Sequence, residues 1–192
     1  MNIIPVFPSL IFSTNIVVLK ELKEYTLNLQ QTESGVSYSN KGGWQSSSYL
    51  HNDDYFVEKY LNYFAVELNK QSILPTWSMN ACWLNVNYKS NYNMLHDHPK
   101  CDYSLVWYIS TPENCGNIVF ENPHSYHQCG FLNHVNPDIS QCYNVFPSYT
   151  FVPKEGDCYL FPSHLKHLVQ ENLSNDARIS MSANIDFIDK QR

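Results

Sequence analysis

The sequence predicts a mainly β fold with N-terminal helices, an α+β chain in which short strands form a sandwich, jelly roll or barrel. The first third has helical periodicity, whereas the rest consists of short aromatic and β-branched runs separated by Pro, Gly, Asn and Asp. Of the 192 residues, 43% are hydrophobic, 15% aromatic and only 16% charged. This composition excludes a disordered chain, a coiled coil and a long charged helical bundle.

Two segments of the N-terminal third have the apolar spacing of an amphipathic helix. The first covers residues 15–30. The second covers residues 53–70, where Asp53 or Asp54 can act as the N-cap. A polar loop, residues 34–48, lies between them. The apolar stripe of the second helix consists of Phe56, Tyr60, Leu61, Phe64, Ala65 and Leu68.

About eight strands are expected in the remainder of the chain, because β-branched and aromatic runs alternate there with turn residues. The longest irregular stretch, residues 123–147, is a loop whose length is typical of a functional element. No internal repeat or linker interrupts the chain, so a single domain is expected over residues 1–192. The predicted strands cover residues 77–88, 94–98, 104–110, 117–121, 149–153, 157–161, 167–170 and 177–187.

The net charge and the cysteine pattern indicate which partners and which cellular location to expect. The formal charge of −6 makes nucleic acid an unlikely partner, because general nucleic-acid binders carry a basic excess. Pro5 and Pro8 interrupt the N-terminal apolar run, so no signal peptide is expected, and no stretch is long enough to cross a membrane. The six cysteines include no C-x-x-C pair. Reduced thiols and a cytoplasmic location are therefore expected.

Three short features offer metal-binding or anion-binding chemistry. The sequence His96-Asp97-His98 falls on a predicted strand, where alternation places both imidazoles on one face and Asp97 on the other. His167 is the first residue of a later predicted strand, His164 precedes that strand, and either could supply a third ligand. Arg178 opens a largely apolar strand, where a guanidinium requires a carboxylate or phosphate partner.

The order of these features resembles the iron- and 2-oxoglutarate-dependent oxygenases, which have a double-stranded β-helix (jelly-roll, cupin-like) core. More narrowly, the chain is similar to the 2OG-Fe(II) oxygenases of marine bacteria and their phages, which are related to prolyl 4-hydroxylases. The resemblance places helical support and loops in residues 1–76 and the catalytic jelly roll in residues 77–192. It is carried by the segments 43–46, 83–87, 96–99, 104–109, 116–123, 156–167 and 178–185.

The resemblance implies a role for each matching residue. His96 corresponds to the first iron ligand, and His167 corresponds to the distal one. Arg178 matches the residue that binds the C5 carboxylate of 2-oxoglutarate, and Tyr108 matches a hydroxyl partner of the same carboxylate. Asn85 or Asn87 matches a donor to the other end of the co-substrate. The implied cofactors are Fe(II), 2-oxoglutarate as co-substrate and O2.

The ligand set departs from the usual two histidines and one carboxylate. His98 stands where the acidic ligand is expected, which favours a site formed by His96, His98 and His167. Asp97 could replace His98 only if a bulge twisted the strand. Losing the carboxylate leaves the site one unit more positive.

The implied function is a dioxygenase that hydroxylates a C–H bond of an unidentified substrate, such as a peptide or amino-acid side chain, and releases succinate and CO2. Two alternatives remain open at this point. One is a three-histidine jelly-roll dioxygenase that does not use 2-oxoglutarate, and the other is a non-catalytic metal- or ligand-binding relative. Small molecules are the expected partners.

Other residues are weaker candidates. Cys101 could be a nucleophile, although no partner residue has a supporting spacing. Trp44 could cover the pocket or anchor its own loop to the core. The loop residues His124, His127 and His134 could contact substrate or a second metal, or could simply be solvated.

Overall fold

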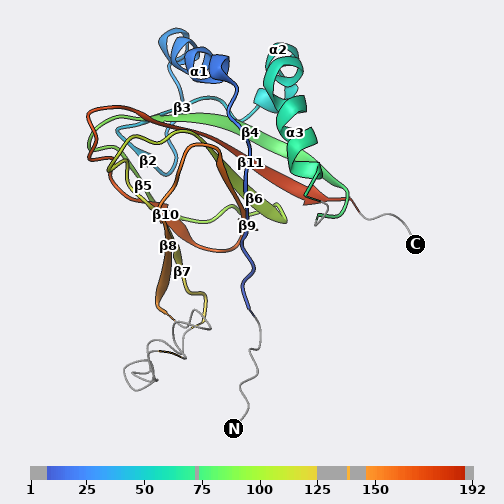
Figure 1. The fold of residues 1–192 in the computed structure, drawn as a ribbon, viewed down its shortest axis with the longest axis vertical. Helices are drawn as coiled ribbons and strands as arrows, with labels where there is room; N and C mark the ends of the chain where they lie inside the picture. The colour runs from blue at the N-terminus through green and yellow to red at the C-terminus, as the bar shows by residue number, and fades with distance from the viewer. Residues whose placement is uncertain (1–7, 72–73, 125–137, 139–145, 189–192) are drawn as a thin grey trace.

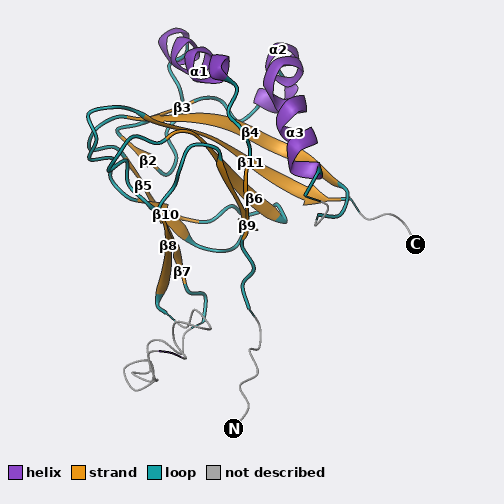
Figure 2. Cartoon of the chain, viewed as in Figure 1, coloured by secondary structure: helices purple, strands orange, loops and turns teal. Residues whose placement is uncertain are grey.

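The chain folds into two facing antiparallel sheets with helices on one side (Figures 1 and 2). The computed structural model describes residues 8–71, 74–124, 138 and 146–188, and the statements below concern these residues. Both sheets together form the predicted double-stranded β-helix core.

The larger sheet has six strands in the order β1-β9-β6-β11-β4-β3, and the smaller has five in the order β2-β5-β10-β7-β8. The larger sheet comprises β1 (Phe12–Asn15), β9 (Asp157–Pro162), β6 (Tyr103–Ser110), β11 (Arg178–Phe187), β4 (Trp77–Asn87) and β3 (Trp44–Gln45). The smaller comprises β2 (Asn40–Lys41), β5 (Tyr92–His96), β10 (His167–Val169), β7 (Ile118–Glu121) and β8 (Ser148–Phe151).

The two faces of the larger sheet bury different kinds of side chain. Alternation along β11 directs Ile179, Met181, Ala183 and Ile185 into the core beneath the helices. The intervening residues of β11 line the cavity between the sheets instead. Because the sheet is covered on both faces, β6 is buried along nearly its whole length. Its central residues, 105–109, are accordingly all aliphatic or aromatic.

The helices cover the outer face of the larger sheet (Figure 2). The first, α1 (Lys20–Thr32), begins later than predicted, because Asn15 instead pairs with Asp157 as the last residue of β1. The second predicted helix is present as an irregular segment, and the side chain of Asp53, rather than Asp54, caps it by accepting a 2.7 Å hydrogen bond from Phe56 N. The segment consists of η1 (Leu50–Asn52), α2 (Asp54–Phe56), the π-helical η2 (Val57–Leu61) and α3 (Asn62–Asn69).

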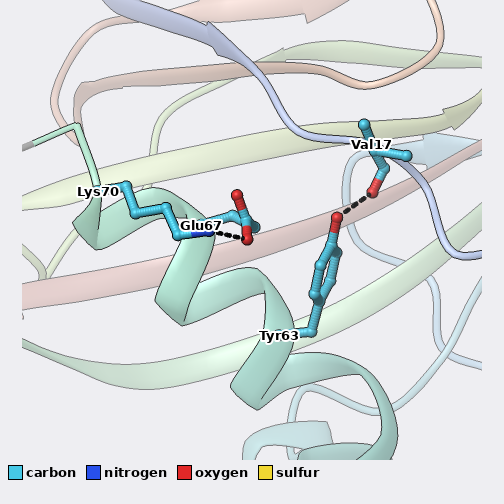
Figure 3. A network of polar contacts seen from close by, with 4 residues as sticks. All are labelled: Val17, Tyr63, Glu67 and Lys70. Carbon is cyan, nitrogen blue, oxygen red and sulfur yellow. Dashed lines mark hydrogen bonds and ion pairs between the residues drawn. The ribbon is translucent and has the colours of Figure 1, made fainter.

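Figure 3 shows two polar contacts of α3, one to the segment that follows β1 and one at its own C-terminal end. Tyr63 donates a hydrogen bond from its hydroxyl to Val17 O at 3.0 Å, and Lys70 forms an ion pair with Glu67 one turn away. The buried faces of the helices contribute Leu22, Phe56, Phe64 and Leu68 to the core of the larger sheet. None of the helices in the described part of the chain is both long and apolar enough to cross a membrane.

All eight predicted strands are present, and none of their ends lies more than two residues from the predicted position. Three strands were not predicted, namely β1, β2 and β3, and all three precede residue 77 and join the sheets. The N-terminal third therefore supplies sheet edges in addition to helices, because two-residue strands such as β2 and β3 carry no periodic signal. The predicted loop 123–147 lies largely outside the described residues, as do His127 and His134.

Removing the Asp53 cap is expected to destabilise the protein. Asp53→Ala leaves the amide of Phe56 without its partner next to a fully buried ring, and losing such a cap costs about 1 kcal/mol. Urea unfolding would measure this as a lower free energy of unfolding. Asp54→Ala, which removes a neighbouring acidic residue without removing the cap, is the control, and an equal loss for both variants would contradict the assignment.

Candidate functional site

A cavity of about 330 Å³ lies between the two sheets. Its floor is formed by inward-facing residues of β4, β6 and β11, and its roof by residues of β5, β7 and β10. Seven of the residues singled out from the sequence contribute to its lining, and Asp97, the alternative ligand, does so as well. The seven are Asn85, Asn87, His96, His98, Tyr108, His167 and Arg178.

Three histidine rings gather on the roof of this cavity. One ring nitrogen from each of His96, His98 and His167 lies within 4.8 Å of the others. The antiparallel pairing of β5 and β10 places His96 directly opposite His167, with 4.3 Å between ring centroids. His98 follows the end of β5 and is held by a 2.9 Å hydrogen bond from its backbone N to Ser163 O.

The strand geometry behind this cluster differs from the prediction. The sequence places His98 on a regular strand, whereas β5 ends at His96. The register with β10 also shifts, since His167 pairs with His96 while Val169 pairs with Asn93, which gives β5 one extra residue. The bulge lies between Asn93 and His96, so it does not separate His96 from His98. The chain beyond the end of β5, rather than strand alternation, therefore brings the two imidazoles together.

In His96 and His167, a backbone carbonyl determines which ring nitrogen is available to bind a metal ion. His96 Nδ1 lies 2.7 Å from Met94 O, and His167 Nδ1 lies 3.0 Å from Leu165 O. Because a carbonyl oxygen only accepts hydrogen bonds, each Nδ1 carries the proton and each Nε2 keeps a free lone pair. The same arrangement orients histidine ligands in metal sites. The third ring, His98, packs against Trp83 with 5.7 Å between ring centroids.

Burial keeps the three imidazoles neutral. It lowers the pKa of His98 to about 4 and that of His167 to about 3, and it lowers the pKa of His96 as well. The neighbouring His96 reinforces the shift of the other two. Since neutral imidazole is the form that binds a metal ion, the cluster is ready to accept one at neutral pH.

Other polar residues near the cluster lie apart from it. Asp97 lines the same cavity but is exposed, and it does not belong to the cluster of three nitrogen ligands. His164, the rival of His167, is exposed on a turn. Cys101 donates from its thiol to His98 O at 3.3 Å, and burial raises its pKa, which disfavours the thiolate that a nucleophile requires. The four cysteines that the structure describes are all free thiols.

A buried positive charge lies at the other end of the cavity. Arg178 is only 2% exposed, and no carboxylate of the described residues forms an ion pair with it. Its Nη1 donates to Cys115 O and to Gln170 O, whereas its Nη2 has no partner within the described part of the chain. A buried guanidinium with one free donor group is costly unless an anion completes the site.

Two further residues of the cavity lining each have a buried polar atom with no partner among the described residues. The hydroxyl of Tyr108 is one, and Oδ1 of Asn87 is the other. Register places both residues near Arg178, because Asn87 pairs with Arg178 and Tyr108 pairs with Ser180, two residues further along β11. Buried polar groups are rarely left unpaired, so three such atoms around one cavity indicate a bound polar ligand.

The amides of Asn85 and Asn87 differ in availability. Asn85 donates from Nδ2 to Ser182 Oγ at 3.2 Å and to Ser180 Oγ at 3.4 Å, so its amide hydrogens are used within the floor. The side chain of Asn87 has no such bond, and its carboxamide can rotate to present either oxygen or nitrogen. Of the two residues, Asn87 is therefore the better placed to contact a ligand.

Gly116 makes the position of Arg178 possible. Its φ of +86° lies in the left-handed region, and a Cβ atom there would collide with Gln170 O and lie 2.9 Å from Arg178 Nη1. In the sequence this glycine appears only as the first residue of the segment 116–123, with no role of its own. Trp44, by contrast, was considered as a cover for the pocket, but it donates to Glu33 O and anchors its loop, while its neighbour Gln45 lines the cavity.

The chain is similar to known oxygenases in sequence and in fold. The sequence profile of the family described as "Putative 2OG-Fe(II) oxygenase" matches residues 81–184, a range that contains every candidate ligand named above. No curated protein matches the chain.

Many solved structures match the chain, among them the following three. The alpha ketoglutarate dependent epimerase SnoN from nogalamycin biosynthesis is 12% identical, with a TM-score of 0.63 over 93% of this chain and 77% of the epimerase. A prolyl hydroxylase from Trichoplax adhaerens, in complex with a hypoxia inducible factor peptide, is 13% identical, with a TM-score of 0.59 over 92% of this chain and 83% of the hydroxylase. For a 2OG-Fe(II) oxygenase family oxidoreductase from Burkholderia pseudomallei, the identity is 16%, the TM-score is 0.44, and the match covers 57% of this chain and 44% of that one.

His167 and His164 allow a direct test of the cluster. His167→Ala removes one of the three gathered nitrogen ligands, and its Co²⁺ affinity is expected to fall at least 100-fold, since even supporting residues of a metal site are worth about 10–100-fold. A Co²⁺ titration followed by visible absorption would measure the loss. His164→Ala, three residues away and exposed, should bind Co²⁺ like the unmodified chain, and the reverse pattern would transfer the ligand role to His164.

Proposed function

Because the chain belongs to the 2OG-Fe(II) oxygenase family, whose enzymes use Fe(II) and 2-oxoglutarate, we propose that it hydroxylates a C–H bond of a substrate held in the cavity between its sheets. The observation that carries the proposal is the pairing of two features in one cavity. One end holds three neutral histidines, and the other holds the buried guanidinium of Arg178 with a free donor group.

In this proposal His96, His98 and His167 hold the Fe(II) ion. The fit rests on the proximity of their ring nitrogen atoms and on the carbonyl contacts that leave Nε2 of His96 and His167 unprotonated. The usual site of this kind includes one carboxylate, so an all-histidine site is one unit more positive. Asp97 remains the alternative acidic ligand, and its exposed position makes it the less suitable one.

2-Oxoglutarate is proposed to bind with its distal carboxylate at Arg178. Planar guanidinium groups match carboxylates in geometry and charge, and Nη2 is available for this contact. The hydroxyl of Tyr108 can donate a second hydrogen bond, and the carboxamide of Asn87, turned so that Nδ2 faces the ligand, can donate a third. These donors lie at one end of the cavity and the histidines at the other, which suits a ligand that is anionic at both ends.

Fe(II), when bound with 2-oxoglutarate and O2, supplies the oxidising chemistry, with succinate and CO2 as co-products. The protein binds and orients the reactants and excludes water. Trp83, Leu105, Val106, Ile118 and Phe161 form the apolar part of the cavity wall, and they shield the reacting groups from solvent.

The substrate is proposed to present an uncharged polar group to the cavity. Arg178 and the exposed Asp97 are the charged residues of the cavity lining, and the histidines are neutral. All other lining residues are uncharged. The volume of the cavity is at the small end of the range for ligand sites. A peptide or amino-acid side chain meets these conditions, and the similar fold of a hydroxylase in complex with a peptide supports this choice. The neutral polar lining includes Gln45, Ser48, Ser182 and Asn184.

The all-histidine cluster also favours a second candidate, a jelly-roll dioxygenase that does not use 2-oxoglutarate. Such an enzyme has no need for a buried guanidinium in the same cavity as its metal. Anaerobic titration of the Fe(II) protein with 2-oxoglutarate separates the two candidates. Only the 2-oxoglutarate-dependent enzyme develops a visible metal-to-ligand charge-transfer band. No band, together with no succinate release under O2, would reject 2-oxoglutarate chemistry.

Tyr108→Phe is expected to separate ligand binding from stability. The hydroxyl of Tyr108 is unpaired among the residues that the structure describes, so its removal should leave the free energy of unfolding unchanged or slightly higher. The dissociation constant of 2-oxoglutarate should rise about 10-fold or more, because a hydrogen bond to a charged group is lost. Calorimetry would provide both numbers, and unchanged 2-oxoglutarate affinity would remove Tyr108 from the binding site.

His98→Asp tests the third ligand. If His98 faces the metal, a carboxylate there should preserve or increase Fe(II) affinity, since it offers a negatively charged ligand to the cation. His98→Ala is the matched variant, and its Fe(II) affinity should fall at least 10-fold. Anaerobic Fe(II) binding would be compared for the two variants, and equal behaviour would indicate that His98 is not a ligand.

A further inference from the structure

We propose that Ser39 is a positioning residue of the site, whose hydroxyl donates a hydrogen bond to the metal-bound carboxylate of 2-oxoglutarate. The inference rests on the proposed function, and it adds a residue from the polar loop that the sequence did not single out. Ser39 lies just before β2 and lines the same cavity as the three histidines and Arg178.

The position of Ser39 is maintained by β5. Met94 donates from its backbone N to Ser39 O at 2.9 Å, and the following residue, Asn40, pairs with Asn93. The side chain of Asn93 donates from Nδ2 to Ser39 Oγ at 3.3 Å. One backbone contact and one side-chain contact therefore hold the hydroxyl against the strand that carries His96.

The direction of the hydroxyl hydrogen follows from its neighbours. Ser39 Oγ lies 3.4 Å from His96 Nε2. That nitrogen carries no proton, because Nδ1 of the same ring is the donor to Met94 O. Asn93 already donates to Ser39 Oγ, so the hydrogen of Ser39 is left to point toward Nε2, the atom proposed to bind the metal.

Metal binding changes the partner of this hydroxyl. Once the lone pair of Nε2 binds a metal ion, it can no longer accept a hydrogen bond, and Ser39 needs another acceptor at the same place. A ligand oxygen on the metal meets that need, and an anionic carboxylate oxygen is the strongest acceptor available. Because Asn93 keeps the hydroxyl in position, the donor is oriented before the co-substrate arrives.

The test compares Ser39→Ala with Ser39→Thr, which retains a hydroxyl. Co²⁺ titration comes first, and both variants should bind Co²⁺ within about 3-fold of the unmodified chain, since Ser39 is not a ligand. Anaerobic titration of the Fe(II) protein with 2-oxoglutarate follows. For Ser39→Ala the dissociation constant should rise about 10-fold and the charge-transfer band should shift, because one hydrogen bond to a charged group is lost. Ser39→Thr should keep the band and most of the affinity.

Two further variants refine the result. Ser37→Ala changes an exposed serine two residues away and should behave like the unmodified chain. Asn93→Ala, which leaves the hydroxyl without its anchor, should weaken 2-oxoglutarate binding by a smaller factor than Ser39→Ala does.

Three results would overturn the role of Ser39. If the band and the 2-oxoglutarate affinity of Ser39→Ala were unchanged, the residue would have only a structural role in its turn. A large loss of Co²⁺ affinity would show that it supports the metal ligands instead. Failure of Ser39→Thr to rescue the band would show that packing, not the hydroxyl, matters. If the unmodified chain itself gave no band, the proposed function would fail together with this inference, which distinguishes that outcome from the other three.

Discussion

The uncompensated charge of Arg178 is the constraint around which the rest of the site is arranged. A guanidinium that is 2% exposed and lacks a carboxylate partner is stable only because two backbone carbonyls accept from it and a cavity lies beside its free donor. Those carbonyls belong to Cys115, which lies shortly before β7, and to Gln170, which directly follows β10. The close approach of these segments in turn requires Gly116, where a side chain would collide with both carbonyl and guanidinium.

The histidine cluster contrasts with this charge, because it is electrically neutral until a metal binds. Burial lowers the pKa values of its members, so the cavity of the free protein carries positive charge at the Arg178 end alone. Metal binding adds positive charge at the opposite end. A small ligand with an anionic group at each end is then matched to both, which is what the proposed binding of 2-oxoglutarate requires.

The layered fold makes such a cavity possible. Helices cover the outer face of the six-stranded sheet with apolar side chains, and the same strands can therefore direct polar residues to their inner face without loss of the core. β11 illustrates this division, since alternate residues enter the core and the cavity. The five-stranded sheet closes the other side and delivers two of the histidines as a directly opposed pair.

Much of this could be predicted from the sequence, because it depends on local periodicity and on the order of a few motifs. Alternation predicted the strands that carry Tyr108, His167 and Arg178, and the order of the motifs resembled one family of oxygenases. The tertiary structure alone decided the rest. The bulge in β5, the approach of Gly116 to Arg178, and the placement of Ser39 beside His96 depend on contacts between segments far apart in the chain. Periodicity carries no information about such contacts, since a two-residue strand or a polar loop looks the same whether or not it meets a metal ligand.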